Sequence, residues 1–231
     1  MTTNTARTIL ITGANKGLGL EATRRLIADG HTVYAGMRDL AAGDAARELG
    51  AHAVQLDVTD DASVAAAIAQ LPALDVLINN AGISGTAQSL DDLTTAATDD
   101  VFATNVTGVV RVSQAALPLL RDSANPVIVN VASGLGFPRF LLDDARIESH
   151  VMTVPYVASK AAVVALTVQY AKNLPGMRVN AVDPGYTATD LNGHSGPQTV
   201  TEGTDAMVSM ALVEADGPTG QFFDREGHIA Y

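Results

Sequence analysis

Short apolar runs recur along the chain and alternate with longer stretches of helical period. The runs are rich in Val, Ile and Leu, which is typical of strands that are buried on both faces of a parallel sheet. We predict a sheet of about seven strands, with residues 220–223 as a short last strand. The other six predicted strands are residues 8–12, 32–36, 53–56, 75–79, 126–131 and 177–182.

Alanine-rich stretches between the strands place apolar residues three and four positions apart, as in a helix with one buried face. Strands that alternate with such helices build βαβ units, which predicts a Rossmann-type, doubly wound α/β fold with helices on both faces. No linker, repeat or shift in composition divides the chain, so we expect one domain over residues 1–231. The predicted helices are residues 17–29, 40–49, 61–70, 99–120 and 155–173.

The number and distribution of charged residues limit the kinds of partner that we expect this chain to bind. The formal net charge is -11 and the 14 Lys and Arg residues form no cluster, so we expect neither nucleic acid nor a membrane as a partner. The chain has no cysteine and its five histidines are scattered, so we predict no metal site. The N-terminal sequence lacks the order of a signal peptide and no apolar stretch could span a bilayer, which favours a cytoplasmic protein.

A glycine-rich turn joins the first predicted strand to the first helix. Glycines at this place allow a tight turn and let a pyrophosphate approach the backbone at the positive end of the helix. Their position in a βαβ unit favours a dinucleotide cofactor, although their spacing differs by one residue from the commoner fingerprint. The residues of the turn that we assign to the cofactor are Gly13, Asn15, Lys16, Gly17, Leu18 and Gly19.

With this spacing, the sequence begins to resemble the short-chain dehydrogenase/reductase family, whose glycine motif is TGxxxGxG. Residues 79–82 (NNAG), 156–160 (YVASK) and 184–185 (PG) match further motifs of the family, in order and at the expected places. The resemblance runs over nearly the whole chain. It implies an enzyme that transfers a hydride between a nicotinamide cofactor and a carbonyl or alcohol group.

The resemblance implies four catalytic residues. Tyr156 and Lys160 are four positions apart, so a helix brings them onto one face. We expect the Lys160 ammonium to lower the pKa of the Tyr156 phenol, so that the phenol can donate a proton to the substrate oxygen at neutral pH. By resemblance, Ser133 would hydrogen-bond the same oxygen, and Asn105 would hold a water that links Lys160 to solvent.

The end of the second strand bears on the choice between NADPH and NADH. NAD enzymes of this fold place an acid there, where this chain has Met37 and then Arg38. Arg38 and Lys16 can bind the 2′-phosphate of NADPH with charge-assisted hydrogen bonds, and this pair resembles the NADPH-preferring carbonyl reductases of the family. NADPH is therefore expected. The alternative is that both cations are solvated and that Asp39 binds the ribose of NAD.

Later strand ends supply further cofactor contacts by resemblance. Asp57 can equally cap the following helix, and the threonines after the sixth strand can serve turn chemistry alone. The predicted contacts are Asp57, Val58, Asn79, Ala81, Gly82, Pro184, Gly185, Thr187 and Thr189.

Two segments near the predicted active site carry less information. Residues 137–153 separate Ser133 from Tyr156 by more than is usual in the family, and we expect a flap or loop over the substrate pocket. Residues 191–202 correspond to the family's mobile substrate lid. We expect His150 and His194, which lie in these segments, to be exposed. Monomeric carbonyl reductases of the family carry a larger insert at the first segment, so a homo-oligomer and a monomer both stay open here.

These observations together predict an NADPH-dependent enzyme that reduces an aldehyde or ketone to an alcohol, with a small molecule as substrate. An epimerase, dehydratase or dehalogenase of the same fold is one alternative. Dehalogenating relatives lose the glycine turn and replace the lysine by arginine, unlike this chain. A regulator that senses NADPH without turnover is a second alternative, but such proteins typically lack part of the Tyr/Lys pair, which is complete here.

Overall fold

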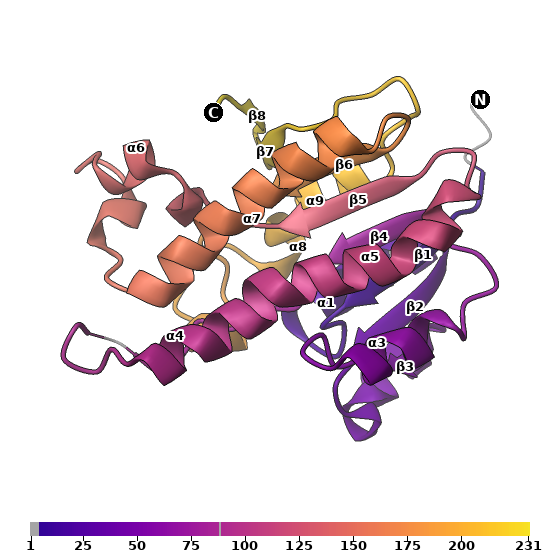
Figure 1. The fold of residues 1–231 in the computed structure, drawn as a ribbon, viewed down its shortest axis with the longest axis horizontal. Helices are drawn as coiled ribbons and strands as arrows, with labels where there is room; N and C mark the ends of the chain where they lie inside the picture. The colour runs from indigo at the N-terminus through magenta and orange to yellow at the C-terminus, as the bar shows by residue number, and fades with distance from the viewer. Residues whose placement is uncertain (1–4, 88) are drawn as a thin grey trace.

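The computed structural model describes residues 5–87 and 89–231, and within them the strands form one eight-stranded sheet (Figure 1). The strand order is β3-β2-β1-β4-β5-β6-β7-β8, and all neighbours are parallel except β7 and β8. This order confirms the predicted Rossmann-type doubly wound sheet. The strands are Thr8–Thr12 (β1), Thr32–Met37 (β2), His52–Gln55 (β3), Val76–Asn79 (β4), Val127–Val131 (β5), Arg178–Val182 (β6), Phe222–Asp224 (β7) and Gly227–Ile229 (β8).

The C-terminal hairpin differs from the expected single strand at residues 220–223. The strand β7 begins two residues later and pairs with β8, so the sheet has one strand more than expected. The Asp224 carboxylate closes the turn by accepting hydrogen bonds from the backbone N–H groups of Glu226 and Gly227. The residues Gly-His-Ile of β8 do not form an apolar run, so the pattern that revealed the other strands could not reveal this one.

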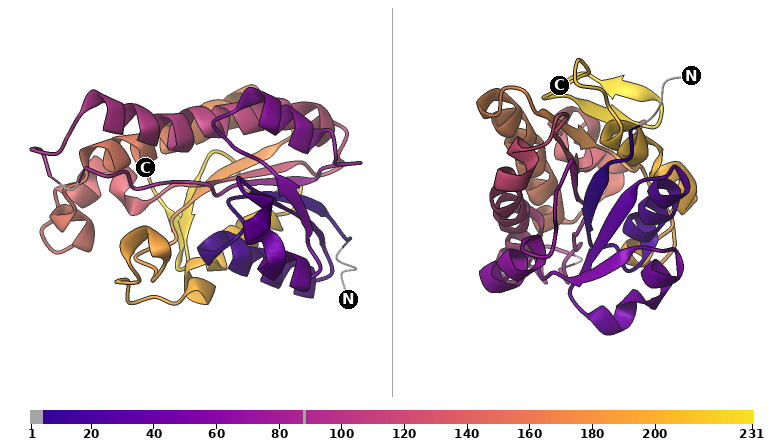
Figure 2. Two further views of the ribbon diagram at one scale, coloured as in Figure 1. Left: turned by 90° about the horizontal axis from the view of Figure 1, so that it is seen from below. Right: turned by 90° about the vertical axis from the view of Figure 1, so that its right-hand side faces the viewer.

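Helices cover both faces of the sheet (Figure 2). The helices α1, α2 and α9 pack on one face, and α3, α5 and α7 pack on the other. The α-helices are Gly17–Ala28 (α1), Asp44–Glu48 (α2), Asp61–Ile68 (α3), Thr95–Phe102 (α4), Gly108–Arg121 (α5), Pro138–Leu141 (α6), Val154–Asn173 (α7), Val200–Gly203 (α8) and Asp205–Ala211 (α9). Single turns of other helix types are Leu40–Gly43 (η1), Ala103–Thr107 (η2), Gly134–Gly136 (η3), Ile147–His150 (η4) and Asp190–Asn192 (η5).

The helix predicted at residues 99–120 starts earlier and is not uniform. It begins at Thr95, where the hydroxyl of Thr94 caps it by accepting a hydrogen bond from the N–H of Ala97. The wider π-turn η2 then lies between α4 and α5. The helix predicted at residues 40–49 is likewise divided into η1 and α2. The helices α8 and α9 were not expected, because they follow a polar segment that reads as a loop.

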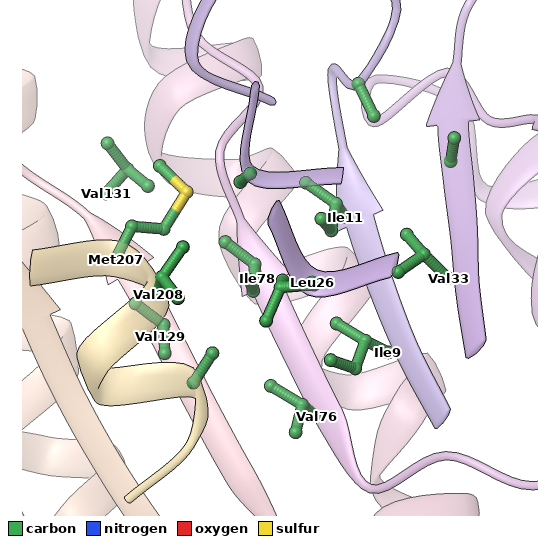
Figure 3. Packing of buried hydrophobic residues seen from close by; sticks show 14 of the residues in the cluster. Ile9, Ile11, Leu26, Val33, Val76, Ile78, Val129, Val131, Met207 and Val208 are labelled. Carbon is green, nitrogen blue, oxygen red and sulfur yellow. The ribbon is translucent and has the colours of Figure 1, made fainter. Parts of the chain in front are cut away.

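The buried strands serve two cores, because successive side chains of a strand point to opposite faces of the sheet. In β1, Ile9 and Ile11 pack with α1 and α9, whereas Leu10 packs with α3 and α5. Figure 3 shows the first of these cores, with Leu26 of α1 and Met207 of α9 among the strand side chains. Burial of each such side chain contributes about 1.5–3 kcal/mol. The uninterrupted apolar runs of the sequence therefore follow from burial on both faces.

One edge of the sheet collects the carboxyl ends of its parallel strands. The start of α4, the segment with α6 and η4, and the loops around η5 all lie beyond this same end of the sheet (Figures 1 and 2). These are the connections that follow β4, β5 and β6. In open α/β sheets, ligands bind outside the carboxyl ends of the strands, so the candidate site lies here.

Candidate active site

The glycine turn between β1 and α1 has a backbone that only glycine accommodates well. Gly13 and Gly17 have φ angles of 66° and 56°, in the left-handed region. A Cβ on Gly19 would lie 2.4 Å from the carbonyl oxygen of Gly13. Within the described residues, no side chain caps the N-terminus of α1. The first turn of this helix is therefore open to a phosphate, which fits a dinucleotide.

Two side chains at the ends of β1 and β4 hold this turn in place. The Thr12 hydroxyl accepts hydrogen bonds from the N–H groups of Asn80 and Ala81, at 3.0 and 2.9 Å. The Asn80 amide donates to the carbonyl oxygens of Thr12 and Gly13, at 2.8 and 3.1 Å. Ala81 in turn packs against Gly13. Thr12 and Asn80 were not among the predicted site residues, although the TG and NNAG motifs contain them.

The side chain of Asn79 faces away from this edge. It is buried, and its amide donates to the hydroxyl of Ser113 and the amide oxygen of Asn130, at 3.0 and 2.9 Å. The amide of Asn130 continues the network to Thr167 on α7. The side chain of Asn79 thus joins β4 and β5 to the helices that cover them. Only its backbone could make the predicted contact with the cofactor.

The side chains at the end of β2 differ in whether they are exposed and free to bind a cofactor. Met37 is buried in the core and Arg38 is exposed. The Asp39 carboxylate accepts a hydrogen bond from the N–H of Ala41 and caps η1, so it is engaged in its own turn. Lys16 forms an ion pair with Asp190, with 2.6 Å between the charged atoms. Arg38 is therefore the more available of the two predicted phosphate ligands.

Asp57 does not cap the next helix, so that alternative is wrong. Its carboxylate accepts hydrogen bonds from the N–H and the hydroxyl of Thr59, which lower its pKa. The cap of α3 is Asp60, which accepts from the N–H of Ser63. Val58 is buried against the start of α5.

The segment after β6 folds back onto the glycine turn. Gly185 has a φ angle of 66°, and its N–H donates to the Asp183 carboxylate. The hydroxyl of the buried Thr187 donates to the carbonyl oxygen of Pro184, which is the turn chemistry that we kept as an alternative. Thr189 caps η5, and its methyl group lies 3.7 Å from the position of a Cβ on Gly17. Thr189 is thus placed beside the glycine turn.

Lys160 and Tyr156 meet on α7 at the carboxyl end of β5. The Lys160 ammonium donates to the carbonyl oxygen of Val131, at 2.8 Å, and lies 5.4 Å from the centre of the Tyr156 ring. Lys160 is buried, with an exposed fraction of 5%, whereas Tyr156 is half-buried. The structure therefore brings together the two residues that the helical spacing predicted.

Ser133 follows β5 and caps the short turn η3. Its oxygen accepts from the N–H of Leu135, at 3.2 Å, which leaves its hydroxyl proton able to donate elsewhere. A Cβ on Gly136 would lie 2.9 Å from the backbone of Lys160. Glycine at this position thus lets η3, which Ser133 caps, pack directly on α7 at Lys160.

Asn105 lies in the π-turn η2, a feature that occurs frequently at functional sites. Its amide oxygen accepts from the N–H of Ile83, and its amide nitrogen donates to the carbonyl oxygen of Ile83 and the hydroxyl of Ser159. A Cβ on Gly82 would lie 3.4 Å from the Asn105 oxygen and 3.7 Å from the Lys160 ammonium. Asn105, Gly82 and Lys160 are thus neighbours, and Ser159 joins them as a residue that the sequence analysis did not single out.

A model of the short chain dehydrogenase family matches residues 7–199, which contain the glycine turn and all four predicted catalytic residues. The chain belongs to this family. One relative, the (-)-isopiperitenone reductase from Mentha piperita, is 32% identical to this chain, over 97% of this chain and 98% of the relative. The putative ketoacyl reductase of the monensin polyketide synthase from Streptomyces virginiae is 39% identical, over 83% of this chain and 74% of the relative.

Solved structures of short-chain dehydrogenases agree with this assignment. The NADPH-bound carbonyl reductase from chicken fatty liver superposes with a TM-score of 0.85 and is 30% identical, over 98% of this chain and 99% of that one. The expected family and its likeness to carbonyl reductases are therefore confirmed.

The electrostatics of this short-chain dehydrogenase site differ from the expectation in one respect. Burial raises the pKa of the Tyr156 phenol, and the negative charge of Asp183 raises it further. Burial also lowers the pKa of Lys160 to about 8, while Asp183 acts in the opposite direction. The expected lowering of the Tyr156 pKa by Lys160 is not found here, because removal of water disfavours the charged forms of both groups.

The segment 137–153 packs beside η3 as two short helical turns, α6 and η4. The Arg146 guanidinium lies 3.8 Å from the centre of the Phe140 ring and pairs with both oxygens of Glu148, at 2.7 and 3.2 Å. Arg139 also stacks on Phe140, at 4.7 Å. His150 is exposed, as expected. The segment is thus held by side-chain stacking and ion pairing.

His194, in the segment after β6, is also exposed as expected, and it pairs with Asp190.

Among the residues that the structure describes, no group of three His, Cys, Asp or Glu side chains could hold a metal ion. In the same part of the chain, no helix is both long and apolar enough to cross a membrane.

Proposed function

We propose that Tyr156, Lys160 and Ser133 are the catalytic residues of an enzyme that reduces an aldehyde or ketone to an alcohol with NADPH. The reaction class and the cofactor follow from the family and its carbonyl-reducing relatives. The observation that carries the residue roles is the placement of the Lys160 ammonium, which lies 5.4 Å from the Tyr156 ring, next to Gly82 and at the end of the strand that leads to Ser133.

The cofactor fits the edge formed by β1, β2 and β4. The left-handed Gly13 and Gly17 and the open first turn of α1 would hold its pyrophosphate, and exposed Arg38 would hold the 2′-phosphate. The other predicted contacts, which are Asn15, Leu18, Ala81, Gly82 and the segment from Pro184 to Thr189, would complete the binding site. When bound, NADPH supplies the hydride that the substrate carbonyl carbon accepts.

Tyr156 is the proton donor of the proposed reaction. As the carbonyl carbon accepts the hydride with its electron pair, the oxygen takes the phenolic proton, and the product is an alcohol beside oxidised cofactor. The raised pKa of Tyr156 keeps the phenol protonated at neutral pH before the reaction. Ser133 polarises the carbonyl through its free hydroxyl proton. The Lys160 ammonium would stabilise the phenolate that remains on Tyr156, and a proton from solvent would restore the phenol. Asn105 holds the backbone of Ile83, which follows Gly82.

The decisive experiment follows NADPH and NADH consumption with a panel of aldehydes, ketones and quinones. We expect turnover with NADPH, and we expect Tyr156→Phe to reduce kcat by about 100- to 10,000-fold, the usual contribution of a general acid. Tyr170→Phe is the matched control, because Tyr170 lies on the same helix but bonds Gln114 away from the site.

Unchanged turnover in folded Tyr156→Phe would remove the proposed proton donor. Tight NADPH binding without turnover across the panel would instead support a regulator. A cytoplasmic location and the choice between homo-oligomer and monomer stay predictions from the sequence, as does the single domain.

A further inference from the structure

Asp183 is a buried acid at the catalytic edge that the proposed mechanism does not use. It directly follows β6, where the carbonyl oxygen of Val182 accepts from the N–H of Ala132. This pairing places Asp183 next to Ser133 and the turn η3. Its exposed fraction is 9%, and its Oδ1 accepts from the N–H of Gly185, at 2.9 Å. Its Oδ2 lies 2.8 Å from the position that a Cβ on Gly134 would take.

Charged groups from three other parts of the fold face this carboxylate. Glu148 of η4 lies against the same point, with its Oε1 2.6 Å from the Cβ position of residue 134. Arg146 neutralises Glu148, and the charge of Asp224, at the end of β7, also acts on Asp183. Lys160 and Tyr156 of α7 complete the surroundings. Glycine at 134 leaves room for both carboxylates against η3.

Lys160 needs a negative charge nearby. A buried ammonium is disfavoured relative to the neutral amine, and its hydrogen bond to the carbonyl oxygen of Val131 supplies only a dipole. Asp183 lies near this ammonium, because Val131, which accepts the Lys160 hydrogen bond, pairs with Val182, the residue before Asp183. The negative charge of Asp183 opposes the effect of burial on Lys160. Burial raises the pKa of Asp183 itself to about 6, so this acid is ionised at neutral pH.

We propose that Asp183 is a positioning residue of the carbonyl reduction, whose fixed carboxylate keeps the buried Lys160 ammonium protonated beside Tyr156. This inference rests on the proposed function. The segment with Arg146 and Glu148 closes over Asp183 and excludes water from it, which strengthens its field at Lys160. The insertion between Ser133 and α7 therefore acts on the charges around the catalytic residues.

The test is the pH dependence of kcat/KM for NADPH-dependent reduction in Asp183→Asn. Asparagine keeps an oxygen that can accept from Gly185 and removes the charge. Since Asp183 raises the pKa values of both Lys160 and Tyr156, its neutralisation lowers both. We expect the alkaline limb of the profile to move to lower pH by about one unit. An Asp144→Asn control removes a carboxylate charge at an exposed position of the neighbouring segment 137–153, and should leave the alkaline limb in place.

Two further variants separate charge from packing. Asp183→Ser removes the charge with a different shape and should move the limb by a similar amount. Asp183→Glu retains the charge, so the alkaline limb of its pH profile should stay at the wild-type pH even if kcat falls. An unmoved limb in both neutral variants, or an equal movement in Asp183→Glu, would overturn the proposal and leave Asp183 a structural residue.

A second measurement does not depend on turnover. The ultraviolet titration of Tyr156 is obtained as the difference between a protein and its Tyr156→Phe counterpart. In the Asp183→Asn background we expect this phenol to ionise at lower pH than in the wild-type background. If the wild type reduced no carbonyl, the proposed function would be wrong. The phenol titration would still test whether the charge of Asp183 acts on Tyr156. An identical phenol titration in both backgrounds would contradict the inference directly.

Discussion

The two sides of the active-site edge are built in different ways. The glycine turn is held by backbone geometry, with Thr12 and Asn80 bonding main-chain groups of neighbouring strands. The segment 137–153 is held by side chains, through the stack of Arg146 on Phe140 and its pair with Glu148. Leu142 in this segment is 83% exposed. We call the segment 137–153 the substrate side, because we expect it to cover the substrate. We expect the cofactor side to tolerate little change, whereas exposed positions of the substrate side, such as Leu142, can change more freely.

Gly19→Ala gives the largest expected effect, and it tests whether the cofactor side depends on its backbone geometry. The new Cβ would meet the carbonyl oxygen of Gly13 and the Asn80 amide, so the turn must open. We expect NADPH affinity to fall at least about 100-fold, since phosphate binding depends on close approach of the backbone. Calorimetric titration with NADPH measures the loss.

Gly30→Ala is the control for Gly19→Ala. Gly30 has a φ angle of 89°, but no described atom lies within 4 Å of its Cβ position. Alanine there should cost stability through backbone strain, about 1 kcal/mol, and leave NADPH affinity unchanged. Equal loss of affinity in both variants would mean that general destabilisation, and not the turn, explains the result.

Arg38→Ala tests whether the cofactor side also selects between nicotinamides. Loss of a charge-assisted hydrogen bond of about 1.5–3 kcal/mol predicts NADPH binding weaker by about 10- to 100-fold, with NADH binding little changed. The ratio of the two KM values reports this selectivity. Arg121→Ala, which removes an exposed cation at the end of α5, should leave the ratio alone. A parallel loss for both cofactors would contradict the assignment of Arg38 to the 2′-phosphate.

Arg146→Ala tests the substrate side. It removes the stack on Phe140 and the partner of Glu148, so the segment loosens. We expect the KM of the carbonyl substrate to rise about fivefold while NADPH affinity stays constant. Arg146→Lys keeps the charge without the flat guanidinium and should show a smaller rise. A loss of NADPH affinity as large as the change in KM would show that the two sides are not independent.

Asp190→Asn gives the smallest expected effect, because it concerns an exposed pair at the junction of the two sides. It releases Lys16 from Asp190, so Lys16 can turn to the cofactor phosphate. We expect NADPH to bind about two- to threefold more tightly at low salt, and the gain to vanish at high salt. Asp205→Asn, which loses its pair with Arg25 instead, is the control. Weaker binding in Asp190→Asn would mean that the ion pair assists the cofactor.

Several parts of the site could be predicted from sequence because their signals are local. Apolar runs revealed β1, β4 and β5, since strands buried on both faces admit few polar residues. The glycine spacing revealed the turn, and the four-residue spacing of Tyr156 and Lys160 revealed their shared helix face. Each of these signals depends on residues that are close in the chain.

What only the tertiary structure decided is the direction and charge environment of side chains. Asn79 and Asn80 are adjacent in one motif, yet the first joins a buried network and the second holds the glycine turn. Asp183 and Glu148 meet across Gly134 from segments that are far apart in the sequence. By itself, the sequence determined the fold, the family and the residue types at the active site. Packing decided their pKa values and partners, because desolvation and Coulomb interactions depend on neighbours in space and not along the chain.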